Sequence, residues 1–382
     1  MQFGADFQSL IERFSQESDR PIALAVSGGS DSLALFHLAH EWATKTDRSL
    51  VVLTVDHGLR PEAKQEAKTV AALSAKLGHT HNTLTWDRPR VSQAAARSAR
   101  YELLAKAASA LNAHVLLAGH TFDDVVETAM IRRRRGVRDA SVAGPVMAAP
   151  VPVWPAGRSL TLLRPLIHSA RRDLRAYLSS RGQAWIDDPS NSSAVYERVR
   201  VRKFLARHPG LFRIAGDFTR EQQKARSAWQ SGLAANLSKV RIDPSGLIDT
   251  GSANMSRHLL KLLIRCASGT ADDARDGALR QLLGALTAPG QRQTLGGAWV
   301  QRSKTGFLIG RDPASPPPEE TGGVFDGRFE KDLSGALSDP AEQPFLVRQS
   351  APPGTHWREI VSERVAHLIR CYQTPLLTLV QR

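Results

Sequence analysis

One loop carries the first residues that could do chemistry. An apolar run, Pro21 to Val26, is typical of a buried strand, and it ends in six residues rich in glycine and hydroxyl groups, Ser27-Gly28-Gly29-Ser30-Asp31-Ser32. Apolar side chains then recur at helical spacing. A glycine-rich turn between a strand and a helix directs backbone N–H groups at an anion, and Asp31 can hold a metal ion or cap the helix. The loop predicts phosphate binding, although an ordinary strand-to-helix turn with a Ser or Asp cap uses the same residue types.

Two common phosphate motifs are absent from this loop. It has neither the lysine of a Walker loop nor the Gly-x-Gly-x-x-Gly fingerprint of dinucleotide-binding folds. The pattern Ser-Gly-Gly-x-Asp-Ser after a buried strand instead resembles the loop of the N-type ATP pyrophosphatases, the PP-loop superfamily. That resemblance implies that the loop holds the pyrophosphate end of ATP and that the substrate is activated by adenylation.

Two further groups of polar residues stand where predicted strands end. Asp56-His57-Gly58-Leu59-Arg60 follows the second strand, and Gly119-His120-Thr121 follows the fourth. Asp124 and Glu127 are three residues apart on the next helix, so they share one face of it. Two such carboxylates suit a metal ion or a cationic substrate, but acidic residues in a first helical turn also simply stabilise the helix dipole.

Arginine and lysine are concentrated in four places before residue 208. Arg97 and Arg100 are spaced i, i+3 on a predicted helix, which suits either a phosphate clamp or two solvated side chains. Basic runs follow at Arg132 to Arg135, at Arg171 to Arg181 and at Arg198 to Lys203. In the last run the basic residues recur at every second position, so they are spread over more than one helix face. Such runs are usually solvated, but beside a nucleotide site they also make a phosphate-binding patch.

The composition limits the classes of protein and partner. The 382 residues include 51 Lys and Arg against 37 Asp and Glu, and the net charge of +14 favours a polyanionic partner. Only two cysteines occur, Cys266 and Cys371, which excludes a disulfide framework and a cysteine metal cluster. Met1 to Arg20 has no signal-peptide core, and no stretch of 18 apolar residues occurs. We therefore expect a soluble, cytoplasmic protein with no membrane partner.

The predicted strands and helices determine whether these residues lie close together in the fold. Four strands are predicted, alternating with helices, over Pro21 to Val26, Ser49 to Val55, His79 to Trp86 and Ala113 to Ala118. This alternation predicts an α/β fold with a doubly wound, Rossmann-like parallel sheet. Ligands bind such sheets beyond the carboxyl ends of the strands. Ser27, Asp56 and His120 all fall at that edge, so we expect them to form one site.

Three domains are expected along the chain. Residues 1–208 form the catalytic domain, and residues 209–312 form a linker helix with a smaller, substrate-binding α+β domain. Residues 313–382 begin with a Pro-rich linker and end in a small C-terminal unit. A β-hairpin is predicted over Gln293 to Gly310, turning near Ser303 to Gly306.

Six motifs occur in an order and spacing that resemble the bacterial tRNA(Ile)-lysidine synthetases. They are the Ser27 to Ser32 loop, Asp56 to Arg60, Arg97-x-x-Arg100-Tyr101, Gly119 to Thr128, Arg164-Pro165-Leu166 and Asp188-Pro189-Ser190-Asn191. The resemblance is strong over residues 20–205 and extends to residues 211–312. It departs from the family pattern at Val199, where the family commonly has Asn, and at the run Arg132 to Arg135.

The resemblance implies a reaction and a set of partners. ATP adenylates the wobble cytidine of a tRNA(Ile) with a CAU anticodon at its C2 oxygen, with Mg²⁺ as the accompanying ion. The amine of free L-lysine then displaces AMP to give lysidine. Arginine runs would hold the tRNA phosphates.

The resemblance also assigns residues to roles. The ATP-binding residues would be Ser27, Gly28, Gly29, Ser30, Asp31, Ser32 and His57, with Asp31 near Mg²⁺. The catalytic residues would be Asp31, Arg97, His120 and Asp124. The substrate would contact Arg100, Asp124, Glu127, Arg198 and Arg200.

Three alternatives use the same loop differently. A tRNA thiolase needs reactive cysteines or an iron–sulfur cluster near the nucleotide, but both cysteines lie outside the first domain. An amidotransferase-type synthetase needs a glutaminase domain, for which the chain has no room. A non-catalytic tRNA-binding protein would keep a vestigial loop, whereas this loop is complete and is accompanied by Asp124 and Glu127.

Overall fold

A computed structural model describes most of the chain in two compact units. The described residues are 3–15, 19–56, 58, 62–86, 93–137, 140–158, 160–187, 195, 197–270, 273–315, 324–331 and 357–373. The first unit is formed by the residues up to Val151 together with Leu160–Trp229, and the second by Pro152–Ser159 and Gln230–Gln373. The division into three domains at residues 208 and 312 stays a prediction.

The first unit is built on a six-stranded sheet with the order β3-β2-β1-β4-β6-β5. The strands are β1 (Ile22–Ala25), β2 (Leu50–Asp56), β3 (Thr80–Thr85), β4 (Val115–Ala118), β5 (Ala148–Pro150) and β6 (Thr161–Leu163). All neighbours pair in parallel except β5, which runs antiparallel to β6 at the edge. The predicted α/β fold with a parallel sheet is therefore confirmed.

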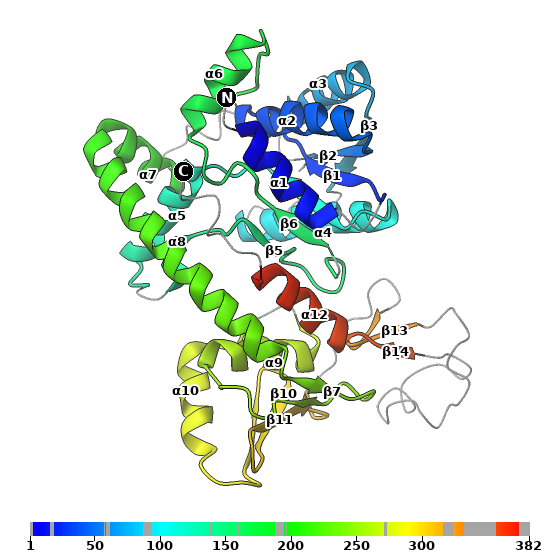
Figure 1. Cartoon of the computed structure of the whole chain (residues 1–382), viewed down its shortest axis with the longest axis vertical. Helices are drawn as coiled ribbons and strands as arrows, with labels where there is room; N and C mark the ends of the chain where they lie inside the picture. The colour runs from blue at the N-terminus through cyan, green and yellow to red at the C-terminus, as the bar shows by residue number, and fades with distance from the viewer. Residues whose placement is uncertain are drawn as a thin grey trace. The chain divides into compact units, whose positions relative to one another are not determined.

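Helices alternate with the first four strands, as the sequence predicts, and further helices follow β6. They are α1 (Phe3–Ser15), α2 (Ser30–Thr46), α3 (Glu62–Lys76), α4 (Gln93–Ala110), α5 (Phe122–Arg134), α6 (Arg171–Ser180), α7 (Glu197–Arg207) and α8 (Pro209–Leu237). In Figure 1, α1 and α2 lie side by side next to β1 and β2. The strand β6 is not among the predicted ones, because three residues are too few to show a period.

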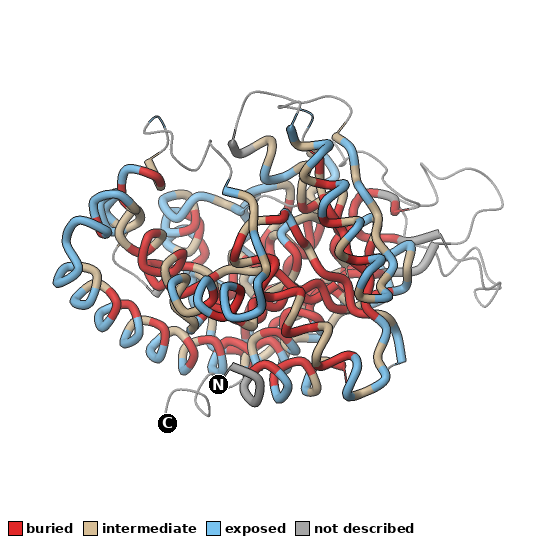
Figure 2. The backbone as a smooth tube through the Cα atoms, turned by 90° about the horizontal axis from the view of Figure 1, so that it is seen from above, coloured by how far each residue is buried: buried red, intermediate tan, exposed pale blue. Residues whose placement is uncertain are grey.

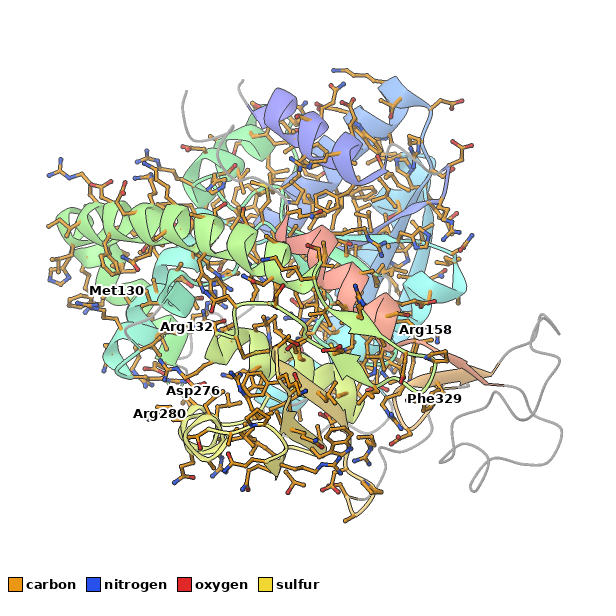
Figure 3. The ribbon with its side chains drawn as sticks, turned by 60° about the horizontal axis from the view of Figure 1, so that its bottom comes forward. Met130, Arg132, Arg158, Asp276, Arg280 and Phe329 are labelled. Carbon is orange, nitrogen blue, oxygen red and sulfur yellow. The ribbon has the colours of Figure 1, made fainter. Side chains whose placement is uncertain are left out.

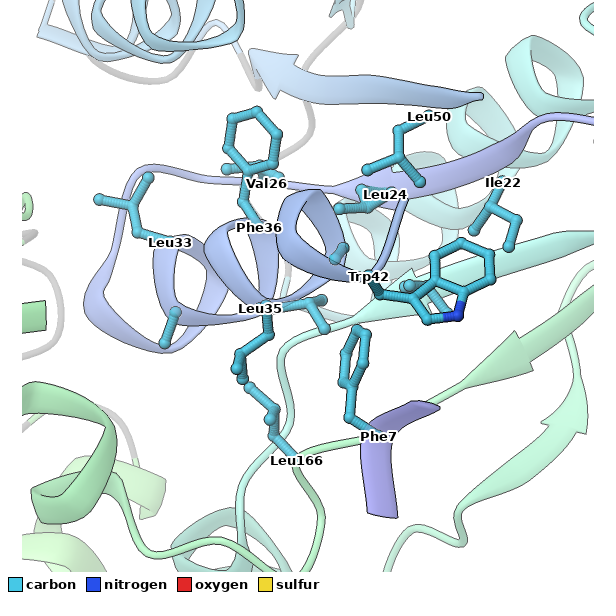
Figure 4. Close-up of a cluster of buried hydrophobic side chains, with 14 of the residues drawn as sticks. Phe7, Ile22, Leu24, Val26, Leu33, Leu35, Phe36, Trp42, Leu50 and Leu166 are labelled. Carbon is cyan, nitrogen blue, oxygen red and sulfur yellow. The ribbon is translucent and has the colours of Figure 1, made fainter. Parts of the chain in front are cut away.

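The core of this unit lies between α2 and the sheet. Apolar side chains of β1 and β2 meet those of α2 and α1, and none of the labelled side chains in Figure 4 is more than 5% exposed. Strands β1 and β4 are apolar at every position because both faces of a parallel sheet are covered. In Figure 2 the buried residues accordingly lie on the strands and on the inner sides of the helices. This core fixes the end of β1 and the start of α2, between which the predicted phosphate loop lies.

The second unit contains two antiparallel sheets. One has the order β7-β8-β11-β10-β9 and the other β12-β13-β14. Their strands are β7 (Arg241–Ile242), β8 (Ile248–Asp249), β9 (Arg292–Leu295), β10 (Ala298–Arg302), β11 (Phe307–Arg311), β12 (Val324–Phe325), β13 (Phe329–Lys331) and β14 (Trp357–Glu359). The helices are α9 (Arg257–Ser268), α10 (Asp276–Ala285) and α12 (Val361–Tyr372). Asp276, labelled in Figure 3, joins α10 to α9 through an ion pair with Lys261 at 2.6 Å.

The predicted hairpin is present as β10 and β11. It turns at residues 303–306, where the Ser303 N–H donates to the Gly306 carbonyl at 2.9 Å. A further strand, β9, precedes it through Gly296 and Gly297, whose φ angles of +60° and +79° favour glycine. The region is therefore a three-stranded meander rather than a single hairpin.

Candidate active site

The predicted phosphate loop closes the end of β1 onto the start of α2. The Ser27 N–H donates to Ser32 Oγ at 3.2 Å, and Ser32 Oγ donates to the Gly29 carbonyl at 3.0 Å. Gly28 has a φ of +84°, and a Cβ atom there would lie 2.7 Å from Ile186 Cδ1. The backbone conformation therefore favours glycine, and a larger residue would also have to displace the end of the Ile186 side chain. The Ile186 N–H donates to the Gly28 carbonyl at 2.9 Å, so this segment lines one side of the loop.

The ends of β1 and β4 meet at this loop. Gly119 directly follows β4, and a Cβ atom there would lie 2.9 Å from the Asp31 carbonyl oxygen and 3.0 Å from Ser32 Cα. Only glycine allows such a close approach of two backbones. The first turn of α2 therefore packs directly on the segment that carries His120, as expected of strand ends at one edge of the sheet.

Asp124 caps the helix that begins after β4. The backbone N–H of Thr121 donates to Asp124 Oδ2 at 2.9 Å, and the Thr121 hydroxyl donates to the same oxygen at 3.1 Å. Burial alone would raise the pKa of Asp124, but Arg171, Arg198 and the Thr121 N–H together lower it. Asp124 is therefore an ionised carboxylate whose second oxygen, Oδ1, faces arginines.

Arg171 connects the loop to the two acids of α5. Its Nε donates to Asp31 Oδ2 at 2.8 Å, its Nη2 to Asp124 Oδ1 at 3.0 Å and its Nη1 to Glu127 Oε1 at 3.4 Å. Burial opposes the charged form, but the three carboxylates raise the pKa of Arg171. The guanidinium is therefore permanently charged and is shared by acids from two helices.

The helix α7 supplies two more arginines to the same acids. Arg198 Nε donates to Glu127 Oε2 at 2.9 Å, and Arg202 binds both Glu127 oxygens, at 2.7 and 3.2 Å. Arg200, between them, is exposed and donates to the Val195 carbonyl at 2.8 Å. The i, i+4 pair thus points inward while the middle arginine points away.

We call this group the acid–arginine cluster. It consists of Asp31, Asp124, Glu127, Arg171, Arg198 and Arg202. Its three carboxylates balance its three guanidiniums. The Glu127 side chain is only 2% exposed, whereas those of Asp31 and Asp124 are 18% and 12% exposed. Asp31 and Asp124 are therefore the acids of the cluster that a ligand can reach.

His120 lies in a positively charged surrounding next to this cluster. Burial, followed by the charges of Arg164, Arg100 and Arg198, lowers its pKa to about 3. Among the described residues, its buried Nδ1 has no hydrogen-bond partner. The imidazole is therefore neutral near pH 7 and keeps one ring nitrogen available for a ligand.

The predicted arginine clamp on α4 surrounds a buried tyrosine. Arg97 and Arg100 lie 5.0 and 5.5 Å from the centre of the Tyr101 ring, and Arg164 is hydrogen-bonded to the same residue. Burial would raise the pKa of Tyr101, but these three arginines lower it. Arg97 is exposed and Arg100 is partly buried. Their role as a phosphate clamp stays a prediction.

The other predicted residues fall outside the cluster or outside the described part of the chain. His57 is not among the described residues. The run Arg132 to Arg135 closes α5, where Arg133 lies 5.2 Å from the Phe218 ring and Arg135 is paired with Glu197. Val199, which departs from the family pattern, is buried on α7.

Two members of the cluster are absent from the predicted site residues. Arg171 is expected only as part of a basic run for tRNA phosphates, yet it lies between three carboxylates. Arg202 is passed over in favour of Arg200. The i, i+4 spacing from Arg198 to Arg202 is a signal that could have identified Arg202, whereas no local pattern marks Arg171.

Comparison with known proteins assigns the chain to a family. The model of the PP-loop domain matches residues 2–208. The tRNA(Ile)-lysidine synthase of Hyphomonas neptunium is 36% identical over 310 residues, which are 78% of this chain and 84% of that protein. The chain belongs to the tRNA(Ile)-lysidine synthase family. Enzymes of this name from Rhizobium meliloti and Caulobacter vibrioides are 36% and 34% identical, over 81% and 84% of this chain and 72% and 76% of their own lengths.

This membership confirms the family to which the six motifs point. The PP-loop domain covers the parallel sheet and the acid–arginine cluster, and it makes the protein an ATP-using enzyme. None of the helices that the structure describes combines the length and the apolar character needed to cross a membrane.

Proposed function

We propose that the protein uses ATP to join free L-lysine to C2 of the wobble cytidine in a tRNA(Ile) with a CAU anticodon. The product is lysidine, and AMP and pyrophosphate are released. The names of the relatives, the complete phosphate loop and the net charge of +14 support this proposal. The observation that carries it is the acid–arginine cluster, which brings Asp31 of the loop and Asp124 of α5 to one guanidinium.

In the first step the cytidine is adenylated. The C2 oxygen attacks the α-phosphorus of ATP, the bond to the β-phosphate oxygen breaks, and pyrophosphate leaves. Ser27 to Ser32 would bind the phosphates through backbone N–H groups and hydroxyls at the start of α2. His57 is proposed to contact the nucleotide as well. Donors fixed in this way stabilise the charge that develops on the departing pyrophosphate.

The residues at the loop fit a magnesium ion that arrives with ATP. Magnesium at nucleotide sites commonly takes one or two carboxylates and completes its shell with phosphate oxygens and water. Within the described part of the chain, no group of three His, Cys, Asp or Glu side chains could hold a metal ion. Asp31 would supply one oxygen, and the ion would neutralise phosphate charge.

In the second step the ε-amine of lysine attacks C2. The bond from C2 to the AMP oxygen breaks, AMP leaves with the electron pair, and the amine loses a proton. Asp124, which is ionised and whose side chain is 12% exposed, would bind the amine and accept that proton. Glu127 would support this acid, while Arg198 and Arg200 would contact the tRNA.

The surroundings of His120 suit the departing phosphate. Arg164, Arg100 and Arg198 place positive charge around the neutral imidazole, and Arg97 adds its charge beside the neighbouring Tyr101. These guanidiniums would stabilise the anion of AMP, and Nδ1 of His120 would accept a hydrogen bond from the activated base. The cytidine has to leave any stack to reach this place, which is easier in an anticodon loop than in a duplex.

A labelling experiment tests the proposal. The protein is incubated with ATP, Mg²⁺, labelled lysine and a tRNA(Ile) transcript with a CAU anticodon. The control is the same transcript with uridine in place of the wobble cytidine. We expect label in the first tRNA alone, with one pyrophosphate released for each lysine. A folded protein that labels neither transcript, or both equally, contradicts the proposal.

A further inference from the structure

The guanidinium of Arg171 lies between the two halves of the proposed site. Asp31 belongs to the phosphate loop and the first turn of α2, whereas Asp124 and Glu127 belong to α5. Arg171 donates to all three carboxylates, at 2.8, 3.0 and 3.4 Å, and its side chain is only 16% exposed. Since the planar guanidinium has donors in a fixed fork, one carboxylate cannot move without affecting its bonds to the others.

Backbone contacts deliver Arg171 to this position. It is the first residue of α6, and its own N–H donates to Asp123 Oδ2 at 2.8 Å. The Phe122 N–H donates to the Ser169 carbonyl at 2.9 Å, so the starts of α5 and α6 are tied together twice. These ties do not involve the Arg171 side chain. They therefore remain available when that side chain is changed.

The charges explain why a cation is needed there. Burial raises the pKa of Asp31, and the nearby charge of Asp124 adds to that rise. Arg171 opposes both effects and holds the two acids in one arrangement. Any ligand that binds one of these acids changes the bonds that Arg171 makes with the other.

We propose that Arg171 is a positioning residue that couples the ATP half of the site to the lysine half. This inference rests on the proposed function, in which Asp31 faces ATP and Asp124 faces lysine. Binding at Asp31 withdraws one partner from the guanidinium, and the remaining bonds to Asp124 and Glu127 readjust. Such coupling is reciprocal, so ATP changes the affinity for lysine by the same factor by which lysine changes the affinity for ATP.

The test measures the dissociation constant of lysine with and without a nucleotide. The probes are L-lysine and Mg²⁺ with an ATP analogue that carries a methylene group between the α- and β-phosphates. No tRNA is present. We expect the analogue to change the lysine dissociation constant of the wild-type protein by about fivefold or more. In Arg171→Gln the ratio should fall to about one, and Arg171→Lys, which keeps the charge but not the fork, should give an intermediate ratio.

Arg172→Gln is the matched control. Its side chain is 88% exposed and pairs with the neighbouring Asp173, so the variant should keep the wild-type ratio. Thermal unfolding of each variant separates lost coupling from lost structure, because a folded Arg171→Gln protein is expected. A ratio that stays at the wild-type value in folded Arg171→Gln overturns the inference, as does a ratio of one in the wild type.

The labelling experiment described above separates a failure of this inference from a failure of the proposed function. Wild-type protein that forms lysidine but shows no coupling overturns the inference alone. Wild-type protein that binds no lysine overturns the proposed function and the inference together.

Discussion

Two clusters of arginines and acids in this molecule differ in how far they are closed. In the second unit, Arg311 and Arg328 share the carboxylate of Asp326, at 3.0 and 2.6 Å, and all three side chains are no more than 4% exposed. Further N–H groups of Arg311 donate to the backbone carbonyls of Gly297, Asp312 and Ser315. We call Arg311, Asp326 and Arg328 the triad; it is enclosed by the backbone of neighbouring segments.

The acid–arginine cluster of the first unit is more open. The side chains of Arg198 and Arg202 are 40% and 32% exposed, and Asp31 and Asp124 are also within reach of solvent. The cluster lies at the carboxyl edge of the parallel strands, beside His120 Nδ1, which has no hydrogen-bond partner in the part of the chain that the structure describes. An enclosed ionic cluster thus holds parts of the fold together, whereas a cluster with partly exposed arginines beside a loop is available for a ligand.

The largest effect on activity should come from Asp124. Replacing it by Asn removes the charge and the base but keeps the size, so lysine transfer should fall about 10²- to 10⁴-fold. The measurement is the initial rate of lysine incorporation into tRNA. Asp173→Asn, on α6 and paired only with Arg172 in the described contacts, is the control and should keep its rate. Equal rates for the two variants would place the base elsewhere.

A substitution in the triad should lower the stability of the protein and leave its activity unchanged. Asp326→Asn leaves two buried guanidiniums without their shared carboxylate, and breaking a buried pair costs about 3–5 kcal/mol. Asparagine tolerates the left-handed backbone at this position, where φ is +51°. Urea unfolding should therefore shift to lower concentration while the rate per folded molecule is kept. If Asp326→Asn instead lowered the rate of lysine transfer and left the unfolding midpoint in urea unchanged, the roles assigned to the two clusters would be wrong.

A smaller effect is expected at Gly28. Alanine at this position would be strained by the φ of +84°, and its Cβ atom would contact the Ile186 side chain. Local backbone strain of about 1–3 kcal/mol distorts the loop, so the KM for ATP should rise about tenfold. Gly78→Ala is the matched control, because Gly78 has a similar φ of +77° but open space around it. If both variants keep the wild-type KM, the loop does not hold ATP.

The smallest effect concerns the pH profile. Because the pKa of His120 is lowered to about 3, the imidazole stays neutral from pH 5 to pH 8 and should cause no inflection near pH 6.5. The lowered pKa of Asp124 keeps that acid ionised over the same range. Transfer rates should therefore rise smoothly with pH as the lysine amine loses its proton. His120→Asn should lower the rate without changing this shape, and an inflection that disappears in the variant would contradict the assignment.

Much of this site can be predicted because its residues follow regular elements. The alternation of strands and helices places Ser27 and His120 at one edge of the sheet, and the spacing of Asp124 and Glu127 places them on one helix face. Arg171 cannot be found in this way, since it reaches Asp31 from a helix 140 positions later in the chain. The burial of Glu127 likewise depends on how α7 packs on α5, which no local pattern specifies.

The most direct test of the central claim follows the α-phosphate of ATP. The protein is given ATP labelled in that phosphate and tRNA(Ile) with a CAU anticodon, first without lysine and then with it. We expect label on the tRNA before lysine is added and its release as labelled AMP afterwards. Label found on lysine in the absence of tRNA, or never found on the tRNA, would contradict it.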